Sequence, residues 1–418
     1  MKKISDNSFL IIFLFLFPCI KSIVHIPFYI EQYDVNNFNF TSYFLNTKVI
    51  AELKIGSPSQ IIKPLLFTDQ STFYLLNNSY NIKKSETYIE KNEIKQKLMG
   101  DRVLNAEDTI ILKNEKKKEI TIKNFPFLLV LNSNINTKDN CIGLSPNFII
   151  KQNKENFFNI LVKKNIINSQ IFTIKFDNKN PTKGELIIGG YPSEYDNKYN
   201  NRYYEYTSSK KDEYEEEIWK IDINKFYYGD DIFMEKYSLE TDFDIRLNGI
   251  FVIQPFIEKI EQDFFNQYIF NDICSINNIS ERFFYYICNK NIDIKLLKSI
   301  KLFSRDLNYT FEININDLIE EIMGKYYFMI FYDSKQPYRW TLGLPFLKKY
   351  QMIFNLNKNT IGFYTKFDEQ KSINFIIIFI FILLIIICFL IYIYFKFCNY
   401  KKRKLRSNEI DDIYYYTT

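Results

Sequence analysis

A single uncharged apolar block near the carboxyl end places the strongest constraint on this chain. The block runs from Phe375 to Phe395. At about 1.5 Å of rise per helical residue, these 21 residues can cross the ~30 Å hydrocarbon layer of a membrane. We therefore predict a transmembrane helix over residues 374–396. The basic cluster behind the block favours this span over a buried core helix. That cluster comprises Lys396, Lys401, Lys402, Arg403, Lys404 and Arg406.

The amino end carries the pattern of a secretory signal. Two lysines precede a short apolar run from Phe9 to Phe17, and Ser22 follows as a small residue. The run is too short to span a bilayer, so we predict a signal peptide over residues 1–22. Positive charge behind the later block then predicts a type I single-pass protein of a secretory-pathway membrane or the plasma membrane. Residues 23–372 would be luminal or extracellular, and residues 397–418 would form a basic cytoplasmic tail.

An oxidising location changes how the cysteines and asparagines are interpreted. Cys274 and Cys288 lie close together in sequence, so we predict a disulfide between them. The apolar neighbours of Cys141 predict a buried thiol. Four acceptor sequences for N-glycosylation fall in the same region, which agrees with the predicted topology. They begin at Asn39, Asn77, Asn278 and Asn308.

Composition excludes several function classes. His25 is the single histidine, so catalytic triads, cysteine–histidine dyads and histidine-rich zinc sites have too few imidazoles. We expect no metal and no other cofactor. The net charge of +5 comes largely from the tail, so we expect no nucleic-acid partner. The 41 Phe, 32 Tyr and 2 Trp supply apolar surface for a large core and exclude a disordered chain.

Short runs of β-branched and aromatic residues recur between the two ends and predict an all-β body. Helical periodicity is confined to residues 155–164 and 255–267. The predicted strands lie at residues 48–55, 109–112, 119–122, 127–131, 171–176, 185–188, 219–223, 326–332 and 352–356.

Several motifs resemble those of the pepsin-like aspartic proteases and occur in that family's order. Residues 51–60 read Ala-Glu-Leu-Lys-Ile-Gly-Ser-Pro-Ser-Gln, close to the Ile-Gly-Thr-Pro-x-Gln turn that opens the family's first lobe. Residues 184–190 read Gly-Glu-Leu-Ile-Ile-Gly-Gly, as in a hairpin of the family. Residues 340–350 contain Trp-Thr-Leu-Gly and Pro-Phe-Leu-Lys-Lys-Tyr, which are similar to its closing strand. The resemblance, which includes plasmepsin-type relatives, covers residues 40 to 366.

This resemblance implies an all-β, bilobal fold with two β lobes around a cleft. We expect an amino-terminal lobe over residues 23–200 and a carboxyl-terminal lobe over residues 201–370, followed by the transmembrane helix. Gly143 and Gly343 match the hydrophobic-Gly segments that run beneath the family's two catalytic turns. The structural supports of the family's active site are therefore present in the sequence.

The first catalytic turn departs from the family pattern. Hydrolysis in this family needs two carboxylates around one water, each supplied by an Asp-Thr/Ser-Gly turn. Alignment with Phe67 in the preceding hydrophobic position places Thr68 at the acid's position, with Asp69 one residue late and Gln70 in place of the glycine. Because successive strand side chains point to opposite faces, we expect the Asp69 carboxylate to point away from the cleft.

The second turn departs further. Counting back from Pro255 along the family's Asp-x-Gly-x-Ser-x-x-x-x-Pro pattern places Arg246 at the acid's position and Asn248 at the glycine's. Arginine stays protonated and cannot act as a base. Asp244 lies two positions early, which we expect to be too far for a shared water. Arg246 would either favour a carboxylate-bearing ligand or pair with Asp244. Gln96 stands where the family has the tyrosine of its flap.

These features favour a membrane-anchored pseudoprotease that binds a peptide or protein ligand in extended form without cutting it. The alternative is an active aspartic endopeptidase that uses a displaced pair, Asp69 with Asp244, after local bulges. A stalk-like surface or adhesion protein is a third interpretation, suggested by the aromatic residues and the glycosylation sites.

Overall fold

The computed structural model divides the chain into two units, Met1–Thr365 and Lys366–Thr418. The predicted signal peptide and the tail beyond residue 397 lie outside the described residues. The structure describes residues 23–33, 39–98, 101–131, 138–146, 156–194, 203–207, 218–235, 238–279, 281–364 and 380–397.

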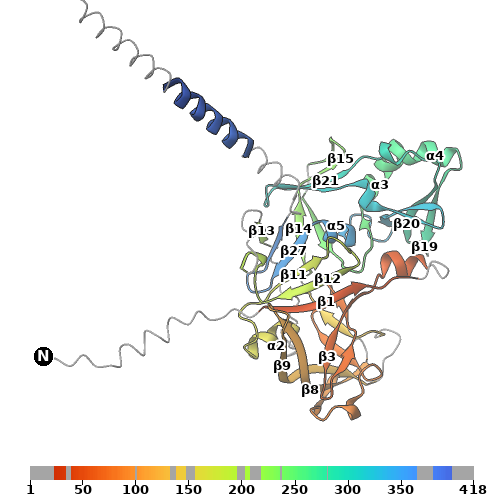
Figure 1. Cartoon of the computed structure of the whole chain (residues 1–418). Coiled ribbons are helices and arrows are strands. Elements are labelled where there is room, and N and C mark those ends of the chain that lie inside the picture. The colour runs from red at the N-terminus through yellow and green to blue at the C-terminus, as the bar shows by residue number, and fades with distance from the viewer. Residues whose placement is uncertain are drawn as a thin grey trace, which may run out of the picture. The chain divides into compact units, whose positions relative to one another are not determined.

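Two β-rich lobes form the first unit (Figure 1). We call residues 23–194 the first lobe and residues 203–364 the second lobe. Runs of β-branched and aromatic residues form the strands because such side chains pack well on a pleated, half-buried surface. In β11 (Ile171–Phe176), for example, five of the six residues are buried. The predicted bilobal, mostly β fold is confirmed.

A sheet of 15 described strands runs through the first lobe and continues into the second. β11 of the first lobe pairs antiparallel with β27 of the second, and Phe172 lies opposite Phe354. This shared sheet holds the two lobes together. In order, the strands are β13 (Tyr203–Thr207), β28 (Thr360–Tyr364), β27 (Gln351–Asn355), β11, β12 (Lys183–Ile188), β1 (Val24–Ile30), β2 (Val49–Ala51), β5 (Leu65–Phe67), β10 (Cys141–Gly143), β6 (Phe73–Leu76), β9 (Glu119–Val130), β8 (Asp101–Asn114), β3 (Leu53–Ile55) and β4 (Gln60–Ile62), with β7 (Ile89–Leu98) paired to β8.

Two further sheets build the second lobe. The larger contains β14 (Lys220–Ile223), β17 (Leu239–Phe243), β26 (Trp340–Leu342), β18 (Ile250–Phe251), β25 (Ile330–Asp333), β20 (Phe283–Asn289), β24 (Lys325–Phe328) and β23 (Ile319–Ile322), with β19 (Cys274–Ile279) paired to β20. The smaller contains β16 (Asp231–Met234), β15 (Lys225–Tyr228), β21 (Ile300–Ser304) and β22 (Tyr309–Ile313).

Short helices occupy both predicted helical stretches. The first contains α2 (Phe157–Lys163), whose amino end is capped by the side chain of Asn156 accepting from the N–H of Asn159. The second contains α3 (Gln254–Ile260), a π-helical turn (Glu261–Phe265) and α4 (Asn266–Phe270). The other helical segments of the first unit are α5 (Leu344–Lys349), a π-helical turn (Thr41–Leu45) and 3-10 turns at Ile82–Lys84, Pro192–Glu194, Ile294–Leu296 and Ile315–Leu318.

Aromatic rings form much of the core between the lobes. Phe172 stacks between Phe158 of α2 and Phe354 of β27, with both ring centroids at 4.9 Å. Trp219 is fully buried beside Phe354, and its Nε1 donates to the carbonyl oxygen of Leu144 at 2.8 Å. Each such ring buries roughly 150–250 Å². The high aromatic content of the sequence is therefore used in packing.

The cysteines take the predicted states. Cys274 and Cys288 lie directly opposite each other on β19 and β20 and form a disulfide. Cys141 is a buried thiol, and burial raises its pKa well above the ordinary value. The four asparagines of the glycosylation sequences are exposed in the structure, and their modification stays a prediction. They are Asn39, Asn77, Asn278 and Asn308.

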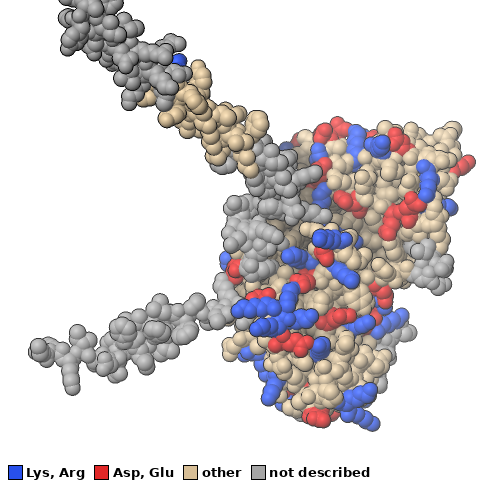
Figure 2. All heavy atoms as spheres, viewed as in Figure 1, with Lys and Arg blue, Asp and Glu red and all other residues tan. Residues whose placement is uncertain are grey.

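Charged side chains of both signs are interspersed on the face of the first unit seen in Figure 2. In the first unit, charged side chains often pair with a neighbour of opposite charge, as Lys54 does with Glu119 at 2.7 Å and Lys298 with Asp231 at 2.8 Å. Such exposed pairs add little to stability. Their alternation leaves this described face without a large patch of one sign.

The second unit contains one described helix, Ile380–Phe397. Its 18 residues are apolar enough, and the helix is long enough, to cross a membrane. It begins six residues after the predicted start at 374, and the residues before Ile380 lie outside the described part. By length and composition, this helix is a candidate membrane span.

Candidate functional site

Two copies of one strand arrangement lie at the centre of the first unit. In the first lobe, β10 lies between β5, which is parallel to it, and β6, which is antiparallel, so that Ile142 pairs with Leu66 and Phe73. In the second lobe, β26 lies between the parallel β17 and the antiparallel β18. There Leu342 pairs with Phe243 and Ile250. Leu66 and Phe243 are therefore equivalent positions.

The turn after β5 is equivalent, residue by residue, to the turn after β17. Phe67 corresponds to Asp244, Thr68 to Ile245, and Asp69 to Arg246. The glycines confirm this register. The N–H of Gly143 donates to the carbonyl oxygen of Thr72, and the N–H of Gly343 donates to that of Gly249, both at 3.1 Å. Thr72 lies five residues after Phe67, and Gly249 lies five residues after Asp244.

Only glycine fits where each turn crosses the strand beneath it. A Cβ on Gly143 would lie 2.5 Å from the backbone of Gln70 and Thr72, and one on Gly343 would lie 2.1 Å from the carbonyl oxygen of Leu247. Backbone atoms cannot move aside as a flexible side chain can. These two glycines therefore allow both turns to pack directly on the central strands.

Thr68 ties the first turn to the second. Its side chain is fully buried, and its Oγ1 donates to the carbonyl oxygen of Phe243 at 3.0 Å. Thr68 Oγ1 also accepts a hydrogen bond from the N–H of Ile245 at 3.3 Å. One hydroxyl thus satisfies two buried backbone groups of the other lobe.

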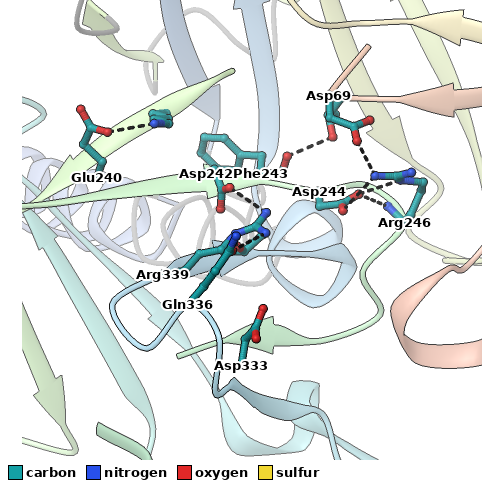
Figure 3. A network of polar contacts seen from close by, with 12 residues as sticks. Asp69, Glu240, Asp242, Phe243, Asp244, Arg246, Asp333, Gln336 and Arg339 are labelled. Carbon is teal, nitrogen blue, oxygen red and sulfur yellow. Dashed lines mark hydrogen bonds and ion pairs between the residues drawn. The ribbon is translucent and has the colours of Figure 1, made fainter. Parts of the chain in front are cut away.

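Arg246 lies between two carboxylates, one from each turn (Figure 3). Its Nη2 is 2.7 Å from Asp69 Oδ2 and 3.3 Å from Asp244 Oδ2, and its Nε is 3.2 Å from Asp244 Oδ1. The backbone N–H of Arg246 also donates to Asp244 Oδ1 at 2.9 Å. The guanidinium lies over the ring of Phe67, 4.8 Å from its centroid, in a cation–π contact. The salt bridge to Asp244, one of the two predicted roles of Arg246, is present.

Burial and charge act on these groups in opposite directions. Burial raises the pKa of the Asp69 carboxyl, Arg246 opposes this, and the neighbouring charge of Asp244 raises it further. Burial alone would lower the pKa of the Arg246 guanidinium, but Asp244 and Asp69 outweigh it and raise the pKa. Arg246 therefore stays a cation. With both carboxylates ionised, the cluster carries a net charge of −1, since two anions face one cation.

A second arginine pairs with a carboxylate of β17. Asp242 lies in this strand, two residues before Asp244. Asp242 is buried, and its Oδ2 accepts from Arg339 Nη2 at 3.0 Å (Figure 3). Arg339 Nε also donates to Thr341 Oγ1 at 2.9 Å. This pair was not predicted, because Arg339 and Asp242 are far apart in sequence.

The segment from Phe40 to Thr47 holds the turn that carries Arg246. The N–H of Thr47 donates to the carbonyl oxygen of Arg246 at 2.8 Å, and the N–H of Asn248 donates to that of Phe44 at 2.7 Å. Phe44 is fully buried in a cluster with Leu247. This segment, which comes from the first lobe, was also not predicted as part of the site.

Comparison with known proteins identifies the fold family. A model of the eukaryotic aspartyl protease family matches residues 50–366, which is most of the chain. The chain belongs to the eukaryotic aspartyl protease family. A search of curated proteins finds no relative.

The aspartyl protease motif falls in a different register from the predicted one. Thr68 has the hydroxyl of the middle residue of Asp-Thr/Ser-Gly, so Phe67 holds the acid's position and Asp69 the glycine's. By equivalence, Asp244 holds the second acid's position and Arg246 the second glycine's. The prediction placed Thr68 and Arg246 at the acids. It failed because Leu66, buried opposite Ile142, fills the hydrophobic position assigned to Phe67.

The second turn was misplaced for a separate reason. Pro255 lies eleven positions after Asp244, whereas the proline of the aspartyl protease pattern lies nine positions after its Asp. Counting back from the proline therefore gave a register two residues late. Gln70 and Asn248, predicted at the glycine positions, lie elsewhere. Gln70 Oε1 accepts from the thiol of Cys141 at 3.3 Å, and Asn248 Nδ2 lies 3.5 Å from Glu320 Oε2.

Both carboxylates contact one side chain. Asp69 was expected to point away from the cleft, yet it and Asp244 both lie within 3.3 Å of the Arg246 guanidinium. The prediction that Asp244 lies too far for a shared water stays a prediction. β5 ends at Phe67, and Thr68 and Asp69 lie in a bend, so strand alternation no longer sets the direction of the Asp69 side chain. What the carboxylates share in this aspartyl protease fold is Arg246.

The remaining predicted residues lie outside this cluster. Gln96 lies in β7, at the register shift between Ile94 and Lys97, and its side chain is outside the described part. His25 lies in β1, where its Nδ1 is 3.1 Å from Glu185 Oε2. Hydrogen bonds from His25 and from Lys117 lower the pKa of Glu185 to about 2. Within the described residues, no group of three or more His, Cys, Asp or Glu could hold a metal ion.

Thr68→Val should destabilise the protein. The substitution leaves the buried carbonyl of Phe243 and the buried N–H of Ile245 without a partner, at a cost of about 1–3 kcal/mol in the free energy of unfolding. Thr68→Ser keeps the hydroxyl and is the matched control, with a smaller loss. Chemical denaturation followed by tryptophan fluorescence measures both, since Trp219 and Trp340 are buried. Equal losses in the two variants would contradict the role of the hydroxyl.

The raised pKa of Asp69 predicts how stability depends on pH. The folded state holds the Asp69 proton more tightly than the unfolded chain does, so this carboxyl favours folding most below its ordinary pKa of about 3.9. That contribution is lost as pH rises through the raised value. The free energy of unfolding of the native protein should therefore fall relative to Asp69→Asn from about pH 3 upward and then level off.

Denaturation at a series of pH values measures this difference for Asp69→Asn. The control is Asp306→Asn, at an exposed turn between β21 and β22. A difference that grows in favour of the native protein as pH rises would contradict the raised pKa. It would show that the Arg246 ion pair outweighs burial at Asp69.

Proposed function

We propose that this protein is a membrane-anchored pseudoprotease that binds a peptide or protein ligand in extended form at the paired turns and does not cut it. The observation that carries this proposal is the composition of the two acid positions. Phe67 occupies one, and the carboxylate of Asp244, in the other, is bound by Arg246. Hydrolysis by this family needs two carboxylates that activate one water and protonate the leaving nitrogen.

The local chemistry argues against each possible replacement. Phe67 cannot take up or release a proton. Arg246 stays protonated and cannot serve as a base. Both oxygens of Asp244 already accept hydrogen bonds from Arg246, and these bonds compete with a hydrogen bond from a water. A positioned acid–base group contributes about 10²–10⁴ in rate, so losing one of two is a severe defect.

Retention of the scaffold supports a binding role. Thr68 still joins the lobes, and Gly143 and Gly343 still allow the close packing beneath the turns. Asp69 and Arg246 remain partly accessible, with side chains 40% and 22% exposed. A ligand can therefore reach this cluster. We place the Arg246 cluster outside the cytosol, because a predicted signal peptide precedes the two lobes in the sequence and the candidate membrane span follows them.

One observation favours the alternative, an aspartic endopeptidase with a displaced Asp pair. Asp69 and Asp244 do meet at one group, and removal of Arg246 from between them would leave two carboxylates facing each other. The ion pairs oppose a movement of Arg246 away from Asp69 and Asp244. Without the guanidinium between them, the two carboxylates would repel each other.

Turnover measured on the full-length protein in detergent distinguishes the two functions. The native protein, Asp69→Asn and Asp244→Asn are each incubated with a peptide library from about pH 3 to 7, the range where carboxylates titrate. We expect no cleavage by any of the three, together with retention of peptides by the native protein. Cleavage by the native protein that is lost in both variants would establish the endopeptidase. Failure to retain any peptide or protein would overturn the binding role.

A further inference from the structure

Among the described residues, two hydrogen-bonding groups of the Arg246 cluster have no partner in another residue. A guanidinium has five N–H donors, on Nε, Nη1 and Nη2. Nε and Nη2 bind the two carboxylates, but Nη1 has no partner among the described residues. Asp69 accepts from Arg246 through Oδ2, and no other residue of the described part donates to its Oδ1. The Asp69 carboxyl also accepts from its own backbone N–H. Within the described residues, the cluster therefore presents a donor group without a partner beside a carboxylate oxygen that no other residue's donor reaches.

The charge of the cluster disfavours an anionic ligand. Arg246 already faces two carboxylates, so a third negative group would meet a net charge of −1 rather than a free cation. The raised pKa of Asp69 indicates that its carboxylate is poorly stabilised and would gain from one more N–H donor. A neutral ligand that offers both an N–H and a carbonyl oxygen fits these needs better than a carboxylate does.

An extended peptide offers those two groups on one edge. In an antiparallel pair, a residue's own N–H and C=O face the same neighbour, and the two residues exchange both hydrogen bonds. Asp69 Oδ1 can take the place of the carbonyl oxygen of a neighbouring strand, and Arg246 Nη1 can take the place of its N–H. Specificity for the backbone follows, since every non-proline residue carries these groups.

The surroundings hold Arg246 in a fixed orientation before any ligand arrives. Both oxygens of Asp244 fix the edge of the guanidinium, and the ring of Phe67 lies against its face. The backbone of the same turn is held by Thr47 and Phe44. An orientation fixed in advance reduces the entropy lost on binding.

We propose that Asp69 and Arg246 bind the main chain of an extended, uncharged peptide segment. Asp69 Oδ1 accepts the N–H of one ligand residue, and Arg246 Nη1 donates to the carbonyl oxygen of that same residue. This inference rests on the proposed function and defines its ligand class. It also reverses one of the two sequence-based interpretations of Arg246, that it favours a carboxylate-bearing ligand.

Ester substitution in a bound peptide tests the inference. The probes are peptides capped at both ends and built from uncharged residues, selected from a library by binding to the full-length protein in detergent. Replacing one amide N–H by an ester oxygen at each position in turn removes one donor at a time. We expect one position to weaken binding by roughly two- to tenfold, which corresponds to one hydrogen bond. That loss should disappear in Asp69→Ala, because the acceptor is then absent.

Two further comparisons complete the test. Arg246→Lys keeps the charge but loses the planar fork, and it should weaken all the uncharged peptides by a similar factor. Asp230→Ala and Arg305→Lys, at exposed sites, are the matched controls and should bind as the native protein does. A glutamate in place of a central glutamine in the peptide should weaken binding to the native protein.

The possible failures are distinguishable. Tighter binding of the glutamate peptides would overturn the inference and leave the proposed binding role intact. Ester substitutions that weaken binding equally in Asp69→Ala and in the native protein would also overturn the inference and leave the proposed binding role intact. If no peptide of any charge binds, the proposed function fails first, and the inference fails with it. Thermal unfolding of each variant shows whether a loss of binding reflects a loss of folding.

Discussion

The guanidinium of Arg246, held between carboxylates from two lobes, is the interaction on which the chemistry of this protein depends. In an active aspartyl protease, the same space holds a water, and two acids share a proton around it. Here both carboxylates contact one guanidinium. In the proposed pseudoprotease, the positive charge of Arg246 replaces the shared proton in balancing the two acids.

The scaffold around this cluster follows from requirements that catalysis does not set. Gly143 and Gly343 are needed because any Cβ would collide with backbone, and Thr68 is needed because buried backbone groups of the other lobe require a partner. These constraints persist whether or not the acids work. Phe67 is compatible with this scaffold, and its ring lies against the Arg246 guanidinium.

The sequence predicted the fold better than it predicted the register of the two turns. Ordered motifs, such as the Ile-Gly-Ser-Pro turn and the Trp-Thr-Leu-Gly strand, each reflect a local packing requirement and could be recognised separately. The Cys274–Cys288 pair was predictable because it closes a short hairpin. The turn register was not, since Leu66 and Phe67 are both apolar and the segment before Pro255 is two residues longer than the pattern. Contacts across the lobes, such as Thr68 with Ile245, carry no local signal in the sequence.

A high-resolution structure from crystals grown near pH 5 is the sharpest test of the Arg246 cluster. We predict that the Arg246 guanidinium lies within hydrogen-bonding distance of both Asp69 and Asp244, and that no water contacts both carboxylates. A structure in which Arg246 is turned away, with one water bound between Asp69 and Asp244, would contradict the inactive, peptide-binding role.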